Sequence, residues 1–432
     1  MSPSASLLAA ALLAPALFAQ PSPIPQSTPS AASASPTQST YTLSPEKREK
    51  AIAYSRARYA LHFAAFVWGV LVLAGIVALR LGPRFRDRAE SLSRRRFGQA
   101  AVFVPLLFVT QSVLMLPIYA YGHHLSLFYE QSVQGWGSWL WDFAKGLLVT
   151  IVIAVPLVWL FYANVRRSPR RWWLRFWLGM LPVIVVLTLA TPVLIDPLFF
   201  RFEPLAPKHP ELARAIERVT ARAGQPIPPE RMFVMNASAK YNAVNAYVTG
   251  LGASKRVVVW DTTIAKSTIP QTLAVFGHEM GHYVLRHVPK TIAFLWGLLF
   301  VLLALGAAIL GRVLRPGRWG IRGLSDWASL PVLLLGLTLA TEAATPLISG
   351  YSRAQEHQAD VFGLEAIHGV VPDSQRAAAE SFQILGEINL ADPDPSPFIR
   401  FWLYDHPPLA DRLRFAADYD PWSKGEKPRY VR

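Results

Sequence analysis

The chain has 432 residues, of which 52% are hydrophobic and only 16% are charged. Soluble domains carry about 25% charged residues, so this composition excludes an ordinary soluble enzyme and favours a membrane protein. The net charge of +15 would suit nucleic acid, but much of the excess is arginine in short loops between apolar stretches, a pattern typical of membrane orientation. We therefore expect no nucleic-acid partner.

The N-terminal residues 1–19 are apolar from Leu7 to Phe18 and end in small residues suitable for cleavage near Ala19. This pattern predicts a signal peptide, with a short uncleaved anchor as the alternative. Residues 20–50 are predicted to be a disordered linker. Its first part, Gln20 to Ser44, is rich in Pro, Ser, Thr, Ala and Gln and can bury too little apolar surface to fold.

Six later segments are apolar over about 20 residues, the length that a helix needs to cross a bilayer. Runs such as Phe294 to Leu303 are too apolar for the buried helices of a soluble protein. We expect a four-span membrane region at 51–199 and a two-span region at 291–349. The predicted spans are Tyr59–Leu79, Ala100–Tyr121, Trp139–Tyr162, Phe176–Phe199, Thr291–Leu310 and Trp327–Ile348.

Arginine is concentrated in the first, third and fifth loops between these spans, whereas the second loop, Gly122–Ser138, has no Lys or Arg. Positive residues favour cytoplasmic loops, so the odd loops are predicted to be cytoplasmic. The polar segments Arg201–Lys290 and Gly350–Arg432 would then face the opposite side, as would Gln20–Arg58 after leader cleavage. The Ala-, Arg- and Pro-rich composition suggests a bacterial source, so this side is the periplasmic or outer face of the inner membrane.

Four charged residues fall within the predicted spans: Asp142, Lys145, Asp196 and Glu342. A charge in hydrocarbon costs free energy, so these side chains should face a polar interior, an interface or one another. Asp142 and Lys145 are three residues apart and could form a helical pair near an interface.

The two polar segments carry shorter patterns of secondary structure. Residues 200–290 form a small α+β insertion, and residues 350–432 continue it with helices. The expected helices are Pro210–Ala223, Pro270–Arg286, Gly350–Gly369, Asp373–Leu390 and Pro408–Ala417, and the expected strands are Arg231–Met235, Ala243–Thr249 and Arg256–Trp260.

The sequence His278-Glu279-Met280-Gly281-His282 lies in the helix predicted over Pro270–Arg286. The two histidines are four residues apart, so their imidazoles project from one helical face and can bind one metal ion. Zinc held by neutral imidazoles lowers the pKa of a bound water, and Glu279 can accept its proton as a general base. This HExxH arrangement predicts a metallopeptidase with one Zn²⁺ per chain; a chance match in a long chain is the alternative.

A catalytic zinc needs a third protein ligand and an open fourth position, and the chain has no cysteine to supply one. A metzincin would place a histidine six residues after His282 with a glycine between them. Val288 and Leu285 occupy those positions, so that class is excluded. His287 should lie off the ligand face, and we expect it on the surface.

Glu356 is the better candidate for the third ligand. It is four residues before Asp360, on one face of a helix directly after the last span. One carboxylate can bind the metal while the other orients a ligand imidazole through its second nitrogen. This spacing alone usually marks a solvated face, but with the HExxH sequence it predicts a gluzincin.

The chain resembles the type I CAAX prenyl proteases, a family of integral-membrane zinc metallopeptidases, with the HtpX-like bacterial heat-shock proteases as more distant relatives. The resemblance runs from about Leu116 to Leu413 and rests on an ordered set of motifs. They are Asp196-Pro197-Leu198-Phe199, Asn245-Ala246-Tyr247, Val259-Trp260-Asp261-Thr262, Gly277 to His282, Ser352-Arg353 through Ala359-Asp360, and His406-Pro407-Pro408.

The resemblance implies a role for each matching residue. His406 would stabilise the oxyanion, where an imidazole proton is worth most in a dry cleft; without the family, a simple helix-entry histidine before Pro407 would be favoured. Asn245 would lie along the substrate backbone, and its strand could pair with an extended peptide. The other implied roles are zinc ligands for His278, His282 and Glu356, general base for Glu279, and a charge pair around the metal for Asp360 and Arg412.

The chain also departs from this family. Eukaryotic members have seven spans with the zinc site facing the cytosol, whereas here the first span is missing or replaced by the leader and the site is predicted to face outward. We therefore expect a mainly α, polytopic membrane protein with a small α+β gluzincin domain that acts as an endopeptidase on membrane-associated or exported polypeptides.

Three other functions can be weighed against this prediction. Processing of prenylated CAAX peptides is an alternative that differs only in substrate. A non-catalytic membrane scaffold or chaperone is another, although the intact residues of the predicted metal site argue against it. A zinc transporter is not expected, because the spans contain no His/Asp cluster.

Overall fold

The computed structural model describes residues 40–250 and 255–431. The predicted signal peptide and the linker up to residue 39 lie outside the described residues. Helix α2 (Pro45–Ala78) begins earlier than predicted, so the extension of the linker to residue 50 is wrong. Ser44 caps this helix by accepting a hydrogen bond from the Lys47 N–H (3.3 Å), and Pro45 at the first helical position favours the start.

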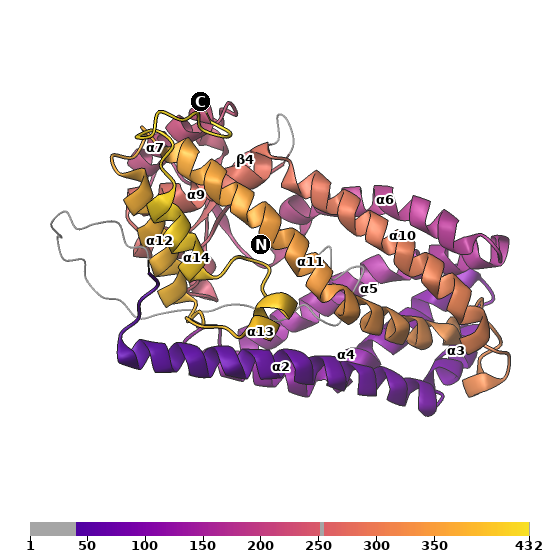
Figure 1. Cartoon of the computed structure of the whole chain (residues 1–432). Coiled ribbons are helices and arrows are strands. Elements are labelled where there is room, and N and C mark those ends of the chain that lie inside the picture. The colour runs from indigo at the N-terminus through magenta and orange to yellow at the C-terminus, as the bar shows by residue number, and fades with distance from the viewer. Residues whose placement is uncertain (1–39, 251–254, 432) are drawn as a thin grey trace.

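Within residues 40–250 and 255–431, six helices are long and apolar enough to cross a membrane, as predicted. They run side by side along the long dimension of the molecule (Figure 1). Most extend several residues beyond the predicted spans, because polar turns continue the same helices outside the apolar stretch. They are α2, α4 (Arg96–Phe128), α5 (Trp136–Arg167), α6 (Trp172–Ala190, extended by η1 Thr191–Ile195 and η2 Asp196–Leu198), α10 (His287–Val313) and α11 (Leu330–Ile367, preceded by η7 Trp327–Ser329).

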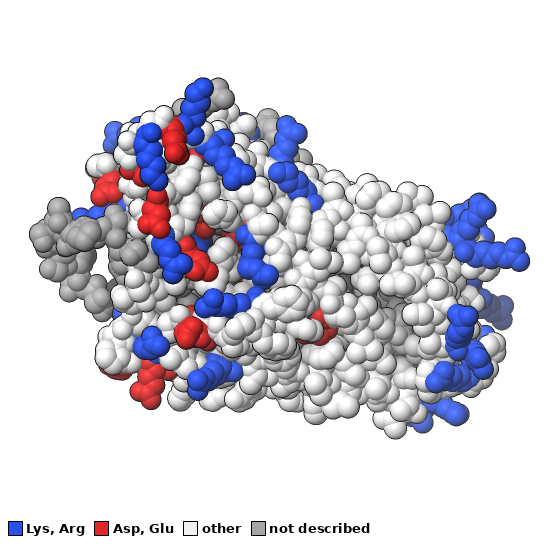
Figure 2. All heavy atoms as spheres, viewed as in Figure 1, with Lys and Arg blue, Asp and Glu red and all other residues white. Residues whose placement is uncertain are grey.

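The arginine-rich loops gather at one end of this bundle, remote from the sheet. Figure 2 shows lysine and arginine clustered there, with a nearly uncharged wall separating them from the other end. Short helix α3 (Leu81–Leu92) lies at this end, where its buried Arg86 donates to Asp326 Oδ2 (2.6 Å) and to the Gly320 carbonyl (3.1 Å). The first and fifth loops therefore share one face, as the orientation argument requires.

A four-stranded sheet lies at the opposite end, in the order β1-β2-β4-β3. Strands β2 and β4 are parallel, and the two outer pairs are antiparallel. The three predicted strands are present; β1 was not predicted because it has only three residues and ends in proline. The strands are β1 (Phe202–Pro204), β2 (Met232–Met235), β3 (Ala246–Thr249) and β4 (Arg256–Trp260).

Helices from both polar segments pack around this sheet and share one hydrophobic core with it (Figure 1). Four of the predicted helices are found within a few residues of their expected bounds: α7 (Pro210–Arg222), α9 (Ile269–Val284), α12 (Ser374–Ile388) and α14 (Leu409–Asp418). The fifth, predicted over Gly350–Gly369, is the C-terminal part of α11. The short helices α8 (Asp261–Lys266) and α13 (Pro397–Trp402) were not predicted, nor were the turns η3 (Pro229–Arg231) and η4 (Ala237–Ala239), nor η6 (Arg318–Gly320) in the fifth loop.

The charged pair of α5 joins the membrane helices to this domain. Lys145 Nζ lies 2.8 Å from Asp142 Oδ1, which is the helical pair expected from the spacing. Asp142 also accepts from Gln134 Nε2 (2.6 Å) and from Lys240, a buried residue of the insertion. The insertion is thus fixed to the membrane region by a charge cluster, in which each charge has a partner.

The backbones of helices α9 and α11 come into contact where the two helices cross. A Cβ atom added at Gly363 of α11 would lie 2.6 Å from the His278 backbone nitrogen, and one added at Gly281 of α9 would lie 3.0 Å from Ala359 Cα. Glycine inside a helix costs about 1 kcal/mol relative to alanine. Its presence here, on both helices, lets the two backbones come into contact.

We predict that Gly363→Ala destabilises the protein, because its methyl group must push against backbone atoms of α9. Overpacking of this kind costs about 1–3 kcal/mol, which corresponds to several degrees in melting temperature. Gly336→Ala on the same helix is the matched control, since nothing lies within 4 Å of its added Cβ. Thermal unfolding in detergent measures both, and equal melting temperatures would contradict the prediction.

Candidate metal centre

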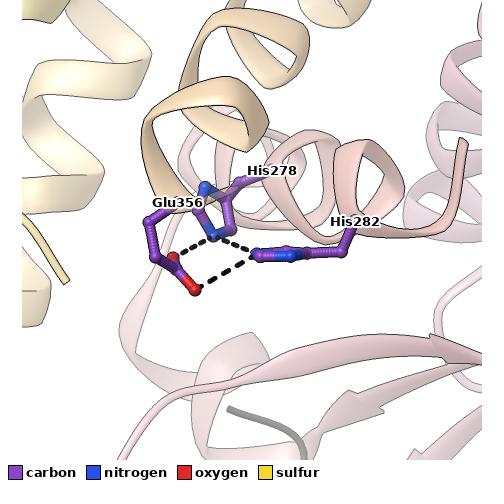
Figure 3. Close-up of side chains that lie close together, drawn as sticks. All are labelled: His278, His282 and Glu356. Atoms are coloured by element: carbon purple, nitrogen blue, oxygen red, sulfur yellow. Dashed lines mark hydrogen bonds and ion pairs between the residues drawn. The ribbon is translucent and has the colours of Figure 1, made fainter. Parts of the chain in front are cut away.

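Two residues of α9 and one of α11 bring their polar ends together. His278 Nε2 and His282 Nε2 are 3.1 Å apart. Glu356 Oε2 lies 3.1 Å from His278 Nε2, and Glu356 Oε1 lies 3.5 Å from His282 Nε2. Figure 3 shows the three side chains pointing toward one another from the two crossing helices. The structure therefore joins the three residues predicted as metal ligands.

This geometry fits a small divalent cation. An ion held tetrahedrally with bonds of about 2.0–2.1 Å has ligand atoms about 3.3 Å apart, close to the separations found here. Glu356 is buried, and three imidazole nitrogens, of His278, His282 and His406, lie 3.1–3.5 Å from its carboxylate oxygens. A buried carboxylate is costly unless positive charge compensates it, and a cation bound between this carboxylate and neutral imidazoles would supply that charge. Two imidazoles and one carboxylate thus form a coherent donor set.

Asp360 contacts His278 on the Nδ1 side of the imidazole, opposite the predicted ligand atom Nε2, and Arg412 pairs with Asp360. Asp360 Oδ1 lies 2.7 Å from His278 Nδ1, and Arg412 donates to both Asp360 oxygens, from Nε (2.9 Å) and Nη2 (2.6 Å). The expected charge pair is therefore present. When Asp360 accepts a hydrogen bond from the Nδ1–H of His278, it fixes the orientation of the ring and directs Nε2 toward Glu356 and His282.

The electrostatics of His278 follow from this arrangement. Burial alone would lower its pKa, but the carboxylates of Asp360 and Glu356 outweigh burial and raise the pKa to about 9. The two carboxylates that favour a proton on His278 would also favour a cation bound beside it.

His287 is a buried partner of the cluster, so its predicted surface position is wrong. Its side chain is 2% exposed, and its Nδ1 lies 3.0 Å from His282 Nδ1. The reason is local: α9 ends at Val284, and Arg286 takes a left-handed conformation (φ 56°) before α10 begins. Helical spacing therefore does not apply between the two histidines. His287 supports His282 much as Asp360 supports His278.

His406 also reaches the site, from the loop before α14. Its Nε2 lies 3.1 Å from Glu356 Oε2, and its Nδ1 lies 2.8 Å from Asp405 Oδ1. It is therefore close enough to act on a group bound beside Glu356. Its function in stabilising an oxyanion stays a prediction.

Glu279 lies on the predicted helix, whereas Asn245 lies just before the strand that was predicted to contain it. Glu279 follows His278 on α9 and is partly exposed. Asn245 directly precedes β3, an edge strand of the sheet, and its backbone is fixed by the Thr263 hydroxyl, which lies 2.7 Å from both its N–H and its carbonyl oxygen. The roles of general base and of substrate contact stay predictions for these two residues.

Two family models match the chain. The family model described as peptidase family M48 matches residues 206–420, which contain all the residues of the centre. A second model, described as the N-terminal part of CAAX prenyl proteases with five membrane helices, matches residues 28–201. The described part of that region contains four candidate spans.

Individual proteins match over most of the chain. The uncharacterized metalloprotease YhfN of Bacillus subtilis is 33% identical over 385 residues, covering 87% of this chain and 86% of the relative. CAAX prenyl protease 1 of Saccharomyces cerevisiae is 27% identical over 406 residues, with 87% and 86% covered. The crystal structure of S. mikatae Ste24p superposes with a TM-score of 0.75 at 25% identity, covering 87% of this chain and 90% of that chain.

Proposed function

The chain belongs to peptidase family M48 and is a membrane metalloprotease, and from this premise we propose that it is a zinc-dependent endopeptidase. Its proposed substrates are membrane-associated or exported polypeptides. The observation that carries the proposal is the convergence of His278, His282 and Glu356, with Glu279 next to them on α9.

The residues of the site divide the proposed reaction between them. His278, His282 and Glu356 would hold the zinc ion, which would supply a Lewis acid to the reaction. Glu279 accepts the proton of the attacking water and returns it to the departing amine. His406 donates to the oxygen that becomes negative in the transition state. Asn245 and β3, the last strand of the described sheet, align the substrate in extended form.

Hydrolysis of prenylated CAAX peptides is a second candidate for the substrate. It is supported by the match to the N-terminal model of CAAX prenyl proteases and by the yeast relative of that name. Matched peptides with and without the isoprenoid would separate the two candidates. Equal cleavage favours general polypeptide hydrolysis, whereas a strict need for the isoprenoid favours the CAAX activity.

We predict that Glu279→Gln retains one zinc ion per chain but loses hydrolysis of fluorescein-labelled casein by about 10²–10⁴-fold, the usual contribution of a general base. The amide keeps the size of the side chain but cannot accept the proton. His282→Ala is the control that should lose both zinc and activity. A Glu279→Gln protein with unchanged hydrolysis would refute Glu279 as the general base, whereas a zinc-loaded wild-type protein that cleaves no casein would favour a scaffold.

We also propose that the catalytic domain lies on the periplasmic face of a bacterial inner membrane. The arginine-rich loops at the far end of the bundle support this orientation (Figure 2). We predict that a reporter active only outside the cytoplasm, fused after Arg432, is active. A well-expressed but inactive fusion would reverse the orientation and restore the arrangement of the eukaryotic family.

A further inference from the structure

The segment that carries His406 is held by one face of α11, the same helix that carries Glu356. After α12 the chain turns back toward the membrane helices, forms α13 and then leads through Tyr404 to His406 (Figure 1). Phe398 of α13 stacks on Phe63 of α2, with ring centroids 6.0 Å apart. The segment therefore lies between α2 and α11, at the boundary of the membrane region.

Arg353 makes the most direct contact with this segment. Its Nη1 donates to the Arg400 carbonyl (3.0 Å) and also to the Tyr404 carbonyl. Carbonyls in the last turn of a helix lack helical donors and carry partial negative charge, so a guanidinium there both satisfies and attracts them. Two residues span at most about 7 Å, so fixing Tyr404 closely restricts His406.

Two further side chains of α11 hold the same segment. Ser349 Oγ donates to the Trp402 carbonyl (3.3 Å). Glu342 Oε1 accepts from the Trp402 indole N–H (2.8 Å) and lies 3.3 Å from His62 Nε2 of α2. Glu342, Ser349 and Arg353 are separated by seven and four residues, so they lie on one helical face. The membrane carboxylate Glu342 thus has a defined partner in the catalytic domain.

The geometry points to Arg353, assisted by Glu342, as a positioning residue that holds His406 at its short distance from Glu356. Arg353 is three residues before Glu356 on a continuous helix, and His406 Nε2 lies 3.1 Å from Glu356 Oε2. One rigid element therefore fixes both a metal ligand and the distance of His406 from it. This inference rests on the proposed function, because it assumes that His406 takes part in hydrolysis.

Kinetics of Arg353→Met test the inference, since methionine keeps the length of the side chain but has no donor. Small misplacements of a catalytic group can cost up to about 10²-fold in rate. We expect kcat on fluorescein-labelled casein to fall by about 10- to 100-fold, with KM and zinc content nearly unchanged. Arg353→Lys should recover part of the loss, because an ammonium can still donate to these carbonyls.

A double variant separates positioning from a general structural effect. If Arg353 acts through His406, Arg353→Met should cause little further loss in a His406→Ala background. Losses that multiply in the double variant would overturn the inference, as would wild-type kcat in Arg353→Met. Arg414→Met is the matched control, because that arginine is 66% exposed on α14 and should not affect kcat.

Trp402→Phe keeps the inference testable if Arg353→Met does not fold. Phenylalanine retains a ring beside Phe398 but removes the donor to Glu342. For Trp402→Phe we expect a smaller loss of kcat than for Arg353→Met, and this loss should also disappear in the His406→Ala background. An unchanged kcat would contradict the inference that the side chains of α11 position His406. If Glu279→Gln is inactive while these variants behave as wild type, the positioning role alone fails. If the zinc-loaded wild type cleaves no casein, the proposed function itself fails.

Discussion

The close crossing of α9 and α11 is the constraint on which the metal centre depends. The ligand side chains of α9 and α11 meet where the two helix backbones come into contact, and Gly281 and Gly363 make this contact possible. Because protein interiors are closely packed, a single added methyl group at such a crossing cannot be absorbed locally. Asp360 contacts the imidazole of His278 and is itself held by Arg412, so these interactions fix the ring where the two helices cross.

Helix α11 also explains how a membrane region and a catalytic domain act as one unit. Its 38 residues extend about 57 Å, nearly twice the thickness of a hydrocarbon core of about 30 Å. The same helix therefore spans the bundle, holds the segment before His406 and provides Glu356. The charge cluster of Asp142 and Lys240 forms a second connection between the two regions. A substrate bound at the site would thus meet groups whose positions are fixed from within the membrane region.

The fold and the ligands could be predicted where the information is local. Helical spacing predicts that His278 and His282 share a face, and apolar length predicts the six spans. Sequence spacing failed at His287, because one left-handed residue, Arg286, breaks the helix between it and His282. The contacts of Arg353 could not be predicted, because they join segments that no periodic pattern relates. Gly277 and Gly281, both inside the HExxH helix, could have indicated that another helix packs closely against it. They do not identify Gly363 as the residue at which that helix makes contact.

X-ray absorption at the zinc edge of the purified, zinc-loaded protein tests the central claim most directly. The account predicts a shell containing two imidazole nitrogens and a carboxylate oxygen at about 2.0–2.2 Å. In Glu356→Ala it predicts loss of the carboxylate contribution together with weaker zinc binding. A spectrum without imidazole, or one that Glu356→Ala leaves unchanged, would contradict a metal centre assembled at the crossing of α9 and α11.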